Sequence, residues 1–206
     1  KQDCTVQLIP QLQQAAVRAG IPVDAVATCK TEYAGHASEL TRQAIEEGAE
    51  YILAVGGDGT VNEIARAMIH SNAILGIIPK GSGNGLAREL HIPMDVKRAI
   101  DLIAKGHVTT IDCCRANGQV FFCTCGVGFD AAVSQKFANE KRRGSLTYIK
   151  NTIEEYLSYK PEPYELVVDN QTIKEKAFLV ACANASQYGD IGTDCVSAWH
   201  GTIHRI

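Results

Sequence analysis

Two short glycine-rich segments carry the residues of this sequence that are best suited to chemistry. The first, residues 54–65, reads AVGGDGTVNEIA, and the second, residues 79–85, reads PKGSGNG. Glycine has no side chain to cover its backbone N–H group, so a phosphate oxygen can approach such a segment closely. Each segment precedes a helical pattern, and the N-terminal end of a helix attracts negative charge. Both segments are therefore candidate phosphate-binding loops.

The glycines of the two loops are expected to act alike. Those of the first loop permit positive φ angles and leave backbone N–H groups uncovered, and those of the second are expected to repeat the arrangement one strand further on. The six positions are Gly56, Gly57, Gly59, Gly81, Gly83 and Gly85. Neither loop is a Walker A motif, because Lys80-Gly81-Ser82 lacks the Gly-Lys-Ser/Thr order. If the sequence had only one such loop, a tight turn between strand and helix would be enough to explain its glycines. Two adjacent loops with polar side chains favour a nucleotide site.

The first half of the chain alternates between strand and helix patterns, which predicts a parallel α/β sheet. Strands are predicted at 23–29, 51–55 and 73–78, the second as a short buried strand. Helices are predicted at 5–19, 35–48, 61–70 and 94–105, with Pro10 bending the first or delaying its start. Both glycine loops then lie at the carboxyl edge of the sheet, where ligands bind in open α/β folds.

The pattern changes near residue 107. Asn117-Gly118 is a strong type I′ hairpin signal between residues 107–116 and 119–125, and a second antiparallel pair is predicted around Asn170-Gln171. Two helices are predicted between these hairpins, at about 130–140 and 145–158. We therefore predict two domains, an α/β nucleotide-binding domain at 1–106 and a partial β-rich domain at 107–206.

Composition narrows the function classes. The chain has 206 residues and a formal net charge of −3, so it has no general basic field for nucleic acid. No apolar run approaches the roughly 20 residues that span a bilayer. We expect a cytoplasmic protein, and peripheral contact with the inner membrane face is left open. None of the eight cysteines forms a C-x-x-C pair or a zinc-type Cys/His cluster, so buried, reduced thiols are expected. Cys123 and Cys125 are predicted to share one strand face, with Cys113 and Cys114 on the hairpin partner.

Five ordered motifs resemble the catalytic domain shared by diacylglycerol kinases, sphingosine and ceramide kinases and bacterial lipid kinases. The two glycine loops match in order and spacing. TEYAGHASELTRQA at 31–44, FFCTCGVGFDAAV at 121–133 and ACANASQYG at 181–189 supply the other three. The likeness therefore extends from about residue 31 to residue 189.

This resemblance implies an ATP-dependent lipid kinase that uses Mg²⁺, with diacylglycerol as the favoured acceptor at a membrane surface. It also implies a nucleotide-binding α/β domain followed by a β-rich lipid-binding domain. Asp58 is the candidate catalytic residue, and no metal ligand is assigned. A homodimer is left open. The implied nucleotide-binding residues are Thr31, Gly56, Gly57, Asp58, Gly59, Thr60, Asn62, Glu63, Gly81, Ser82, Gly83 and Asn84.

The sequence also departs from the family pattern. It lacks the family's opening Asn-Pro-x-Ser-Gly loop, and Gly85 stands where many diacylglycerol kinases have an aspartate. The Gly-Ser-Gly-Asn form is closer to sphingosine and ceramide kinases, so a sphingoid or ceramide acceptor is an alternative. Residues 190–206 do not match the family's downstream strand and carboxylate base, which suggests a fragment or an altered reading frame. Asp58 is thus the best remaining base, with helix capping or a metal network as alternatives.

Other functions fit the sequence less well. NAD kinases share Gly-Gly-Asp-Gly-Thr, but the second loop and Gly-Phe-Asp-Ala argue against them. Residues 126–131, GVGFDA, fit a dinucleotide fingerprint without the parallel βαβ unit it requires. The basic cluster at 136–145 is either a solvated loop or a contact for anionic lipid. His36 is either a nucleotide-loop residue or a surface cap. A nucleotide-binding module without catalysis is the alternative from another class.

Overall fold

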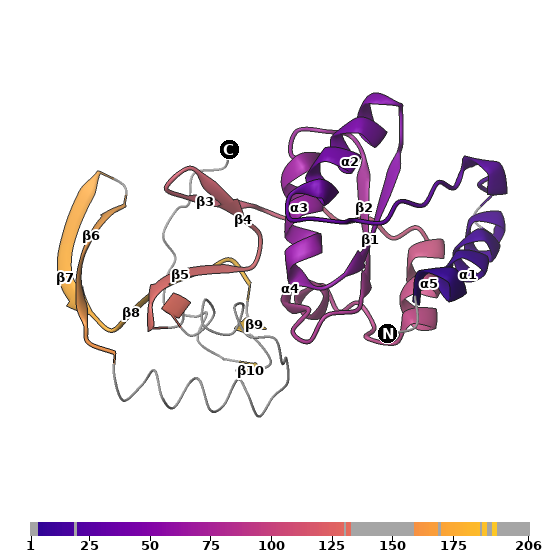
Figure 1. Cartoon of the computed structure of the whole chain (residues 1–206). Coiled ribbons are helices and arrows are strands. Elements are labelled where there is room, and N and C mark those ends of the chain that lie inside the picture. The colour runs from indigo at the N-terminus through magenta and orange to yellow at the C-terminus, as the bar shows by residue number, and fades with distance from the viewer. Residues whose placement is uncertain are drawn as a thin grey trace.

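The computed structural model describes residues 4–18, 20–129, 131–132, 159–168, 170–185, 187–188 and 191–192. Helices gather around two strands in the first half of the chain, and short strands make up the described part of the second half (Figure 1). The predicted fold class, a parallel-sheet α/β unit followed by a β-rich unit, is confirmed. Within the described residues, no helix combines the length and the apolar character that crossing a membrane needs.

A parallel strand pair lies at the centre of the first half. β1 (Tyr51–Gly56) pairs with β2 (Ile74–Pro79), and the register aligns Gly56 with Pro79 at their carboxyl ends. Five helices accompany the pair: α1 (Cys4–Arg18), α2 (His36–Glu46), α3 (Asp58–Met68), α4 (Gly85–Glu89) and α5 (Val96–Ala104).

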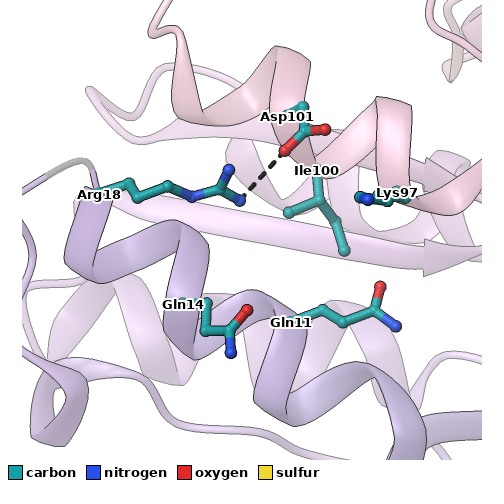
Figure 2. A pocket seen from close by; sticks show the side chains of 6 residues that line it. All are labelled: Gln11, Gln14, Arg18, Lys97, Ile100 and Asp101. Carbon is teal, nitrogen blue, oxygen red and sulfur yellow. Dashed lines mark ion pairs between the residues drawn. The ribbon is translucent and has the colours of Figure 1, made fainter.

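Helices α1 and α5 pack on one face of β2. Ile78 of β2 is fully buried among Leu8 and Leu12 of α1 and Ile100 of α5. At the outer surface, Arg18 of α1 forms an ion pair with Asp101 of α5 at 3.1 Å. Figure 2 shows a pocket of about 250 Å³ between these helices. It contains none of the residues predicted to bind nucleotide, so it is separate from the glycine loops.

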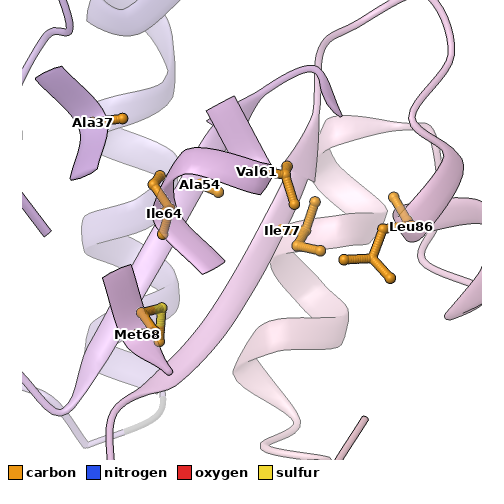
Figure 3. Close-up of a cluster of buried hydrophobic side chains, with 8 residues drawn as sticks. Ala37, Ala54, Val61, Ile64, Met68, Ile77 and Leu86 are labelled. Atoms are coloured by element: carbon orange, nitrogen blue, oxygen red, sulfur yellow. The ribbon is translucent and has the colours of Figure 1, made fainter. Parts of the chain in front are cut away.

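The opposite face packs against α2, α3 and α4. Ile77, the residue before Ile78, points into this second cluster because successive strand residues alternate between faces. The cluster, drawn in Figure 3, contains Ala37, Ala54, Val61, Ile64, Met68, Ile77, Leu86 and Ala87. Because residues of α3 and α4 share it, one hydrophobic core holds the helices that follow both glycine loops.

Two helix boundaries differ from the sequence prediction. α1 contains Pro10 in its interior, so the proline does not delay the helix. α3 begins at Asp58, three residues before the predicted start at Val61. The helix therefore starts inside the glycine loop, and the loop itself forms its first turn.

The predicted strand at 23–29 is wrong. Val23–Ala25 form a short 3-10 helix, η1, and the following residues have no regular structure. Pro22 and Asp24 favour a turn there, and in the described part of the chain β1 pairs with β2 alone. The prediction of a buried β1 is also wrong in part, since Tyr51 is 48% and Val55 37% exposed.

The second half contains antiparallel pairs. β3 (Cys114–Ala116) and β4 (Gln119–Phe121) form the first predicted hairpin, and positive φ angles of 48° at Asn117 and 78° at Gly118 confirm its type I′ turn. β6 (Glu162–Val168) and β7 (Gln171–Ala177) form the second. β5 (Thr124–Gly128) pairs with β8 (Leu179–Ala183), and β9 (Gln187–Tyr188) with β10 (Ile191–Gly192).

Several predictions for this half are wrong or untested. Residues 119–125 do not form one strand, because β4 ends at Phe121 and β5 begins at Thr124. Cys123 therefore precedes β5, and Cys125 pairs with β8 rather than with the hairpin that carries Cys114. The helices predicted at 130–140 and 145–158 fall almost entirely outside the described residues, as does the basic cluster at 136–145. The domain boundary near residue 107 stays a prediction.

Candidate functional site

The two glycine loops lie against each other at the carboxyl ends of β1 and β2. The Lys80 N–H group donates to the Gly56 carbonyl at 2.8 Å. A Cβ atom on Gly57 would lie 2.9 Å from Gly81 Cα, and one on Gly81 would lie 2.5 Å from Gly57 Cα. Backbone atoms occupy both places, so neither position has room for a side chain. The loops are joined backbone to backbone.

Close packing, and not a positive φ angle, explains these glycines. None of the six loop glycines has a positive φ angle, and Gly57 has φ of −97°. The positive φ angles that glycine permits are therefore not used at these six positions. A Cβ on Gly56 would lie 2.8 Å from the Cβ and Oγ1 atoms of Thr60. Gly59 differs, since a Cβ there would meet nothing within 4 Å.

Asp58 connects the first loop to the second. Its carboxylate accepts the Asn84 N–H group at 2.8 Å and the Gly85 N–H group at 2.6 Å. These two residues begin α4, so the carboxylate caps α4 from a distant part of the sequence. It does not cap α3, whose N-cap residue is Gly57 without a side-chain bond. The side chain proposed as a base thus holds the second loop in place.

Asn84 shapes the second loop from within. It is buried and left-handed, with φ of 57°, and is the one residue of either loop with a positive φ angle. Its side chain accepts the Gly81 N–H group and donates to the Gly81 carbonyl, both at 2.8 Å. Arg88 Nε donates to the Gly83 carbonyl at 2.8 Å. The N–H groups of Gly81, Asn84 and Gly85 are therefore used within the protein, unlike the predicted repeat of a phosphate cradle.

The first loop keeps its N–H groups available. The first bond into α3 runs from the Val61 N–H group to the Gly57 carbonyl at 3.1 Å. The N–H groups of Asp58, Gly59 and Thr60 precede that bond and have no acceptor within the helix. Together with the positive end of the helix dipole, they form a site that fits a phosphate oxygen. Ser82 is exposed on the facing loop.

Glu63 secures the segment that carries Thr31. Its carboxylate accepts the Gly35 N–H group at 3.0 Å, and Ser38 Oγ donates to its backbone carbonyl at 2.8 Å. These bonds attach the start of α2 to α3. Thr31 is exposed on the irregular segment just before, and Asn62 is half-buried on α3. Glu63 therefore has a structural role, while Thr31 is left facing solvent.

His36 belongs to a small cluster at the start of α2. Its Nδ1 atom accepts the Glu32 N–H group at 3.1 Å, and its ring stacks on Tyr33 with centroids 4.4 Å apart. The Tyr33 hydroxyl donates to Glu39 at 2.6 Å, and this hydrogen bond raises the pKa of Tyr33. These contacts favour the surface-cap interpretation of His36.

Sequence reasoning missed the position of Cys123 at this site. A Cβ on Gly85 would lie 3.2 Å from its Sγ atom. Burial first, and then the nearby carboxylates of Asp58 and Glu89, raise the pKa of the Cys123 thiol to about 11. The space that a side chain at position 85 would enter is thus bordered by this thiol. In the sequence, the one signal for this placement is Gly85, which stands where many diacylglycerol kinases have an aspartate.

Contacts from the second half hold Cys123 there. Asn184 donates from its side chain to the carbonyls of Asp112 at 2.9 Å and Phe122 at 3.0 Å, and its N–H group donates to the Cys123 carbonyl at 2.7 Å. Arg66 Nε of α3 donates to the Val120 carbonyl at 2.7 Å. Asn184, which belongs to the motif at 181–189, therefore positions the chain that borders Gly85.

The GVGFDA motif also has a structural explanation. Gly128 has a positive φ angle of 99°, and a Cβ there would lie 2.7 Å from the Phe178 carbonyl oxygen. Phe129 stacks on Phe178 with centroids 4.7 Å apart. Because β5 pairs antiparallel with β8, the motif lacks the parallel unit of a dinucleotide fingerprint.

Metal binding by the protein alone has no support in the described ranges. No group of three or more His, Cys, Asp or Glu side chains among those residues is arranged to hold an ion. The available N–H groups fit phosphate, so a divalent cation at this site would depend largely on the oxygens of a bound nucleotide.

Comparison with protein families gives two matches. Residues 3–116 match the diacylglycerol kinase catalytic domain, and residues 123–195 match the YegS C-terminal NAD kinase beta sandwich-like domain. The first match contains both glycine loops. The second contains Cys123, β5 and Asn184.

Individual proteins give a consistent result. A diacylglycerol kinase of Staphylococcus haemolyticus is 30% identical over 175 residues, which are 83% of this chain and 52% of the relative. An uncharacterised protein of Synechocystis is 28% identical, covering 88% of this chain and 43% of the relative. A crystal structure of a diacylglycerol kinase from Bacillus anthracis is 27% identical with a TM-score of 0.69, covering 94% of this chain and 63% of that one. The chain thus spans about half of these curated relatives or less.

Proposed function

The chain belongs to the diacylglycerol kinase catalytic domain family, and we propose that it forms the nucleotide-binding part of an ATP-dependent lipid kinase. The contact between the two glycine loops carries this proposal. It brings the first turn of α3 and the exposed Ser82 to one edge of the sheet, which is where we expect a triphosphate to bind. The N–H groups of residues 58–60 would donate to phosphate oxygens, and Mg²⁺ would offset phosphate charge.

We assign Asp58 first to holding this arrangement. Both of its oxygens accept backbone N–H groups of the second loop, at 2.8 and 2.6 Å. A carboxylate has further lone pairs, so it can still accept a proton from an acceptor hydroxyl. Acting as the base would use those remaining lone pairs without releasing α4. The two roles are compatible, and different measurements separate them.

Diacylglycerol is the acceptor we favour, because several relatives are named diacylglycerol kinase. The Gly-Ser-Gly-Asn loop supports a sphingoid base or ceramide as the alternative. Either acceptor resides in a membrane, so the protein would have to reach it at the lipid surface.

Transfer of radiolabelled phosphate tests the proposal. The full-length protein is incubated with [γ-³²P]ATP, Mg²⁺ and mixed micelles that contain diacylglycerol, sphingosine or ceramide. We expect labelled lipid, with diacylglycerol labelled fastest, and label reduced by about 100-fold or more with Asp58→Ala. Absence of transfer to all three lipids would refute the lipid kinase.

Nucleotide binding without transfer is the second candidate. The engagement of both Asp58 oxygens favours it, since the only carboxylate nominated as base already has a structural role. Calorimetric titration of the full-length protein with ATP and with a non-hydrolysable analogue distinguishes the candidates. Equal affinities, with no turnover in the lipid assay, would select a binding module.

A further inference from the structure

Two cysteines face each other across the β5–β8 pair. The register places Cys125 opposite Cys182. Ladder bonds from Asn184 to Cys123 and from Phe129 to Phe178 lie at even spacings on both sides, so Cys125 and Cys182 form a hydrogen-bonded pair. In such pairs the Cα atoms are about 5.5 Å apart. That separation is within the usual range of a disulfide.

The two thiols are in contact and differ in access. Cys182 is exposed, Cys125 is half-buried, and both are reduced. Burial first, and the neighbouring Cys182 side chain second, raise the pKa of the Cys125 thiol to about 11. The exposed thiol is therefore the one that an oxidant reaches, and the half-buried thiol is its neighbour.

We propose that Cys125 and Cys182 are an oxidation-sensitive pair that closes into a disulfide between β5 and β8. With hydrogen peroxide as oxidant, the Cys182 sulfur attacks one oxygen, the O–O bond breaks, and the hydroxide released becomes water. Cys182 is then a sulfenic acid. The Cys125 sulfur loses its proton and attacks the Cys182 sulfur, the S–O bond breaks, and a second water leaves. Two thiols have been oxidised, and one peroxide has been reduced to two waters.

The position of the pair connects it to the glycine loops. Cys123, two residues before Cys125, borders Gly85, and Asn184, two residues after Cys182, holds the Phe122 and Cys123 carbonyls. A disulfide would fix the strand pair from which these contacts arise. The inference goes beyond the proposed function, because it needs no nucleotide or lipid.

Cys114 is the competing partner. It is buried, and burial raises its pKa, with Cys113, Asp112 and Cys182 nearby. It belongs to β3, which does not pair with β5 or β8. Its strand register therefore does not place it opposite either thiol, whereas Cys125 and Cys182 face each other across the β5–β8 pair.

Peptide mass analysis of the full chain tests the proposal. The reduced protein is treated with one equivalent of hydrogen peroxide, blocked with iodoacetamide and digested with trypsin. We expect peptides 116–136 and 177–205 to be joined, with two hydrogens fewer than the separate peptides. These peptides also contain Cys123 and Cys195, so fragment spectra must locate the bond at Cys125 and Cys182. A bond at any other pair, or over-oxidised Cys182 without a bond, would overturn the proposal.

Variants and heat stability complete the test. Cys29→Ser removes an exposed cysteine from a distant segment and should leave the crosslink unchanged. Cys182→Ser should abolish it. The oxidised wild-type protein should melt about 5 °C or more above the reduced protein, because the bond closes a long loop. An unchanged melting temperature in a fully crosslinked sample would show that the bond does not stabilise the strand pair.

Discussion

The loop after β1 and the loop after β2 both run from a parallel strand into a helix, and both are rich in glycine. In the second loop, three N–H groups are used by the Asn84 and Asp58 side chains. In the first, the N–H groups of residues 58–60 precede the first helical bond and have no acceptor within the helix. The second loop is therefore a rigid support, and the first is the surface that can bind an anion.

This difference shows that one composition can satisfy two physical requirements. Gly57 and Gly81 are glycines because the loops touch, whereas Gly59 has open space where its side chain would be. Steric need explains the first two positions. The third has no such steric need, and the proposed close approach of a phosphate group to the N-terminus of α3 would account for it.

The largest expected effect comes from breaking the connection between the loops. Asp58→Ala leaves the N–H groups of Asn84 and Gly85 without their acceptor, so α4 loses its cap and the second loop moves away. We expect lipid phosphorylation to fall by about 100-fold or more. The free energy of unfolding should fall by about 1–2 kcal/mol, measured in urea.

ATP titration of the same variant separates its two roles. A supporting role requires weaker ATP binding together with lower stability. If ATP affinity and stability are unchanged while transfer is lost, Asp58 acts as a base and the supporting role is wrong. Asp95→Ala is the matched control, since Asp95 caps α5 by accepting the Arg98 N–H group at 3.0 Å, away from both loops.

The steric argument predicts the next effect. In Gly81→Ala the new Cβ would lie 2.5 Å from Gly57 Cα, and in Gly57→Ala 2.9 Å from Gly81 Cα. Because backbone has to move in both, each variant should lose about 1–3 kcal/mol of unfolding free energy, with Gly81→Ala the worse.

Gly59→Ala is the matched comparison for these two variants. It should keep or gain stability, by up to about 1 kcal/mol, because alanine favours a helix and the space is open. Its affinity for ATP should nevertheless fall, on the order of tenfold. Normal ATP affinity in Gly59→Ala would contradict the assignment of the first loop to phosphate.

Asn84 tests the support within the second loop. Asn84→Gly removes the two bonds to Gly81 but tolerates the φ angle of 57°, whereas Asn84→Ala removes the bonds and strains the backbone as well. Asn84→Ala should therefore be less stable than Asn84→Gly by about 1 kcal/mol in urea unfolding. Equal losses would show that the side-chain bonds alone hold the turn.

Local signals made part of this fold predictable. β1, β2 and the Asn117-Gly118 turn follow from apolar runs and from a dipeptide that tolerates positive φ. The strand predicted at 23–29 failed because a strand also needs a neighbour, which a local pattern does not reveal.

The candidate site was predicted less completely, for the same reason. Motif order located both loops, but the bond between Asp58 and Gly85 joins residues far apart in the chain. The role of Asp58 as a cap for α4 could not be read from residues 54–65. The placement of Cys123 beside Gly85 depends on Asn184, which is further still along the sequence.

The smallest expected effect concerns the titration of the Cys123 thiol, which reports whether the second loop stays closed. Burial and the Asp58 and Glu89 carboxylates raise the pKa of Cys123 from 9.0 to about 11. The folded state thus holds this proton more tightly than the unfolded state. Its contribution to stability is complete below pH 9 and is lost as the pH rises toward 11.

Alkylation with iodoacetamide, followed by peptide mass analysis, measures this directly. Cys123 should react slowly until the pH approaches 11, with the exposed Cys29 as the internal reference for reagent access. Asp58→Ala removes one of the charges and opens the loop, so Cys123 should react at lower pH in that variant. Gly59→Ala leaves the contact between the loops intact and should keep the wild-type profile. If Cys123 reacts like Cys29 in the wild-type protein, the second loop is not the closed support that its hydrogen bonds describe.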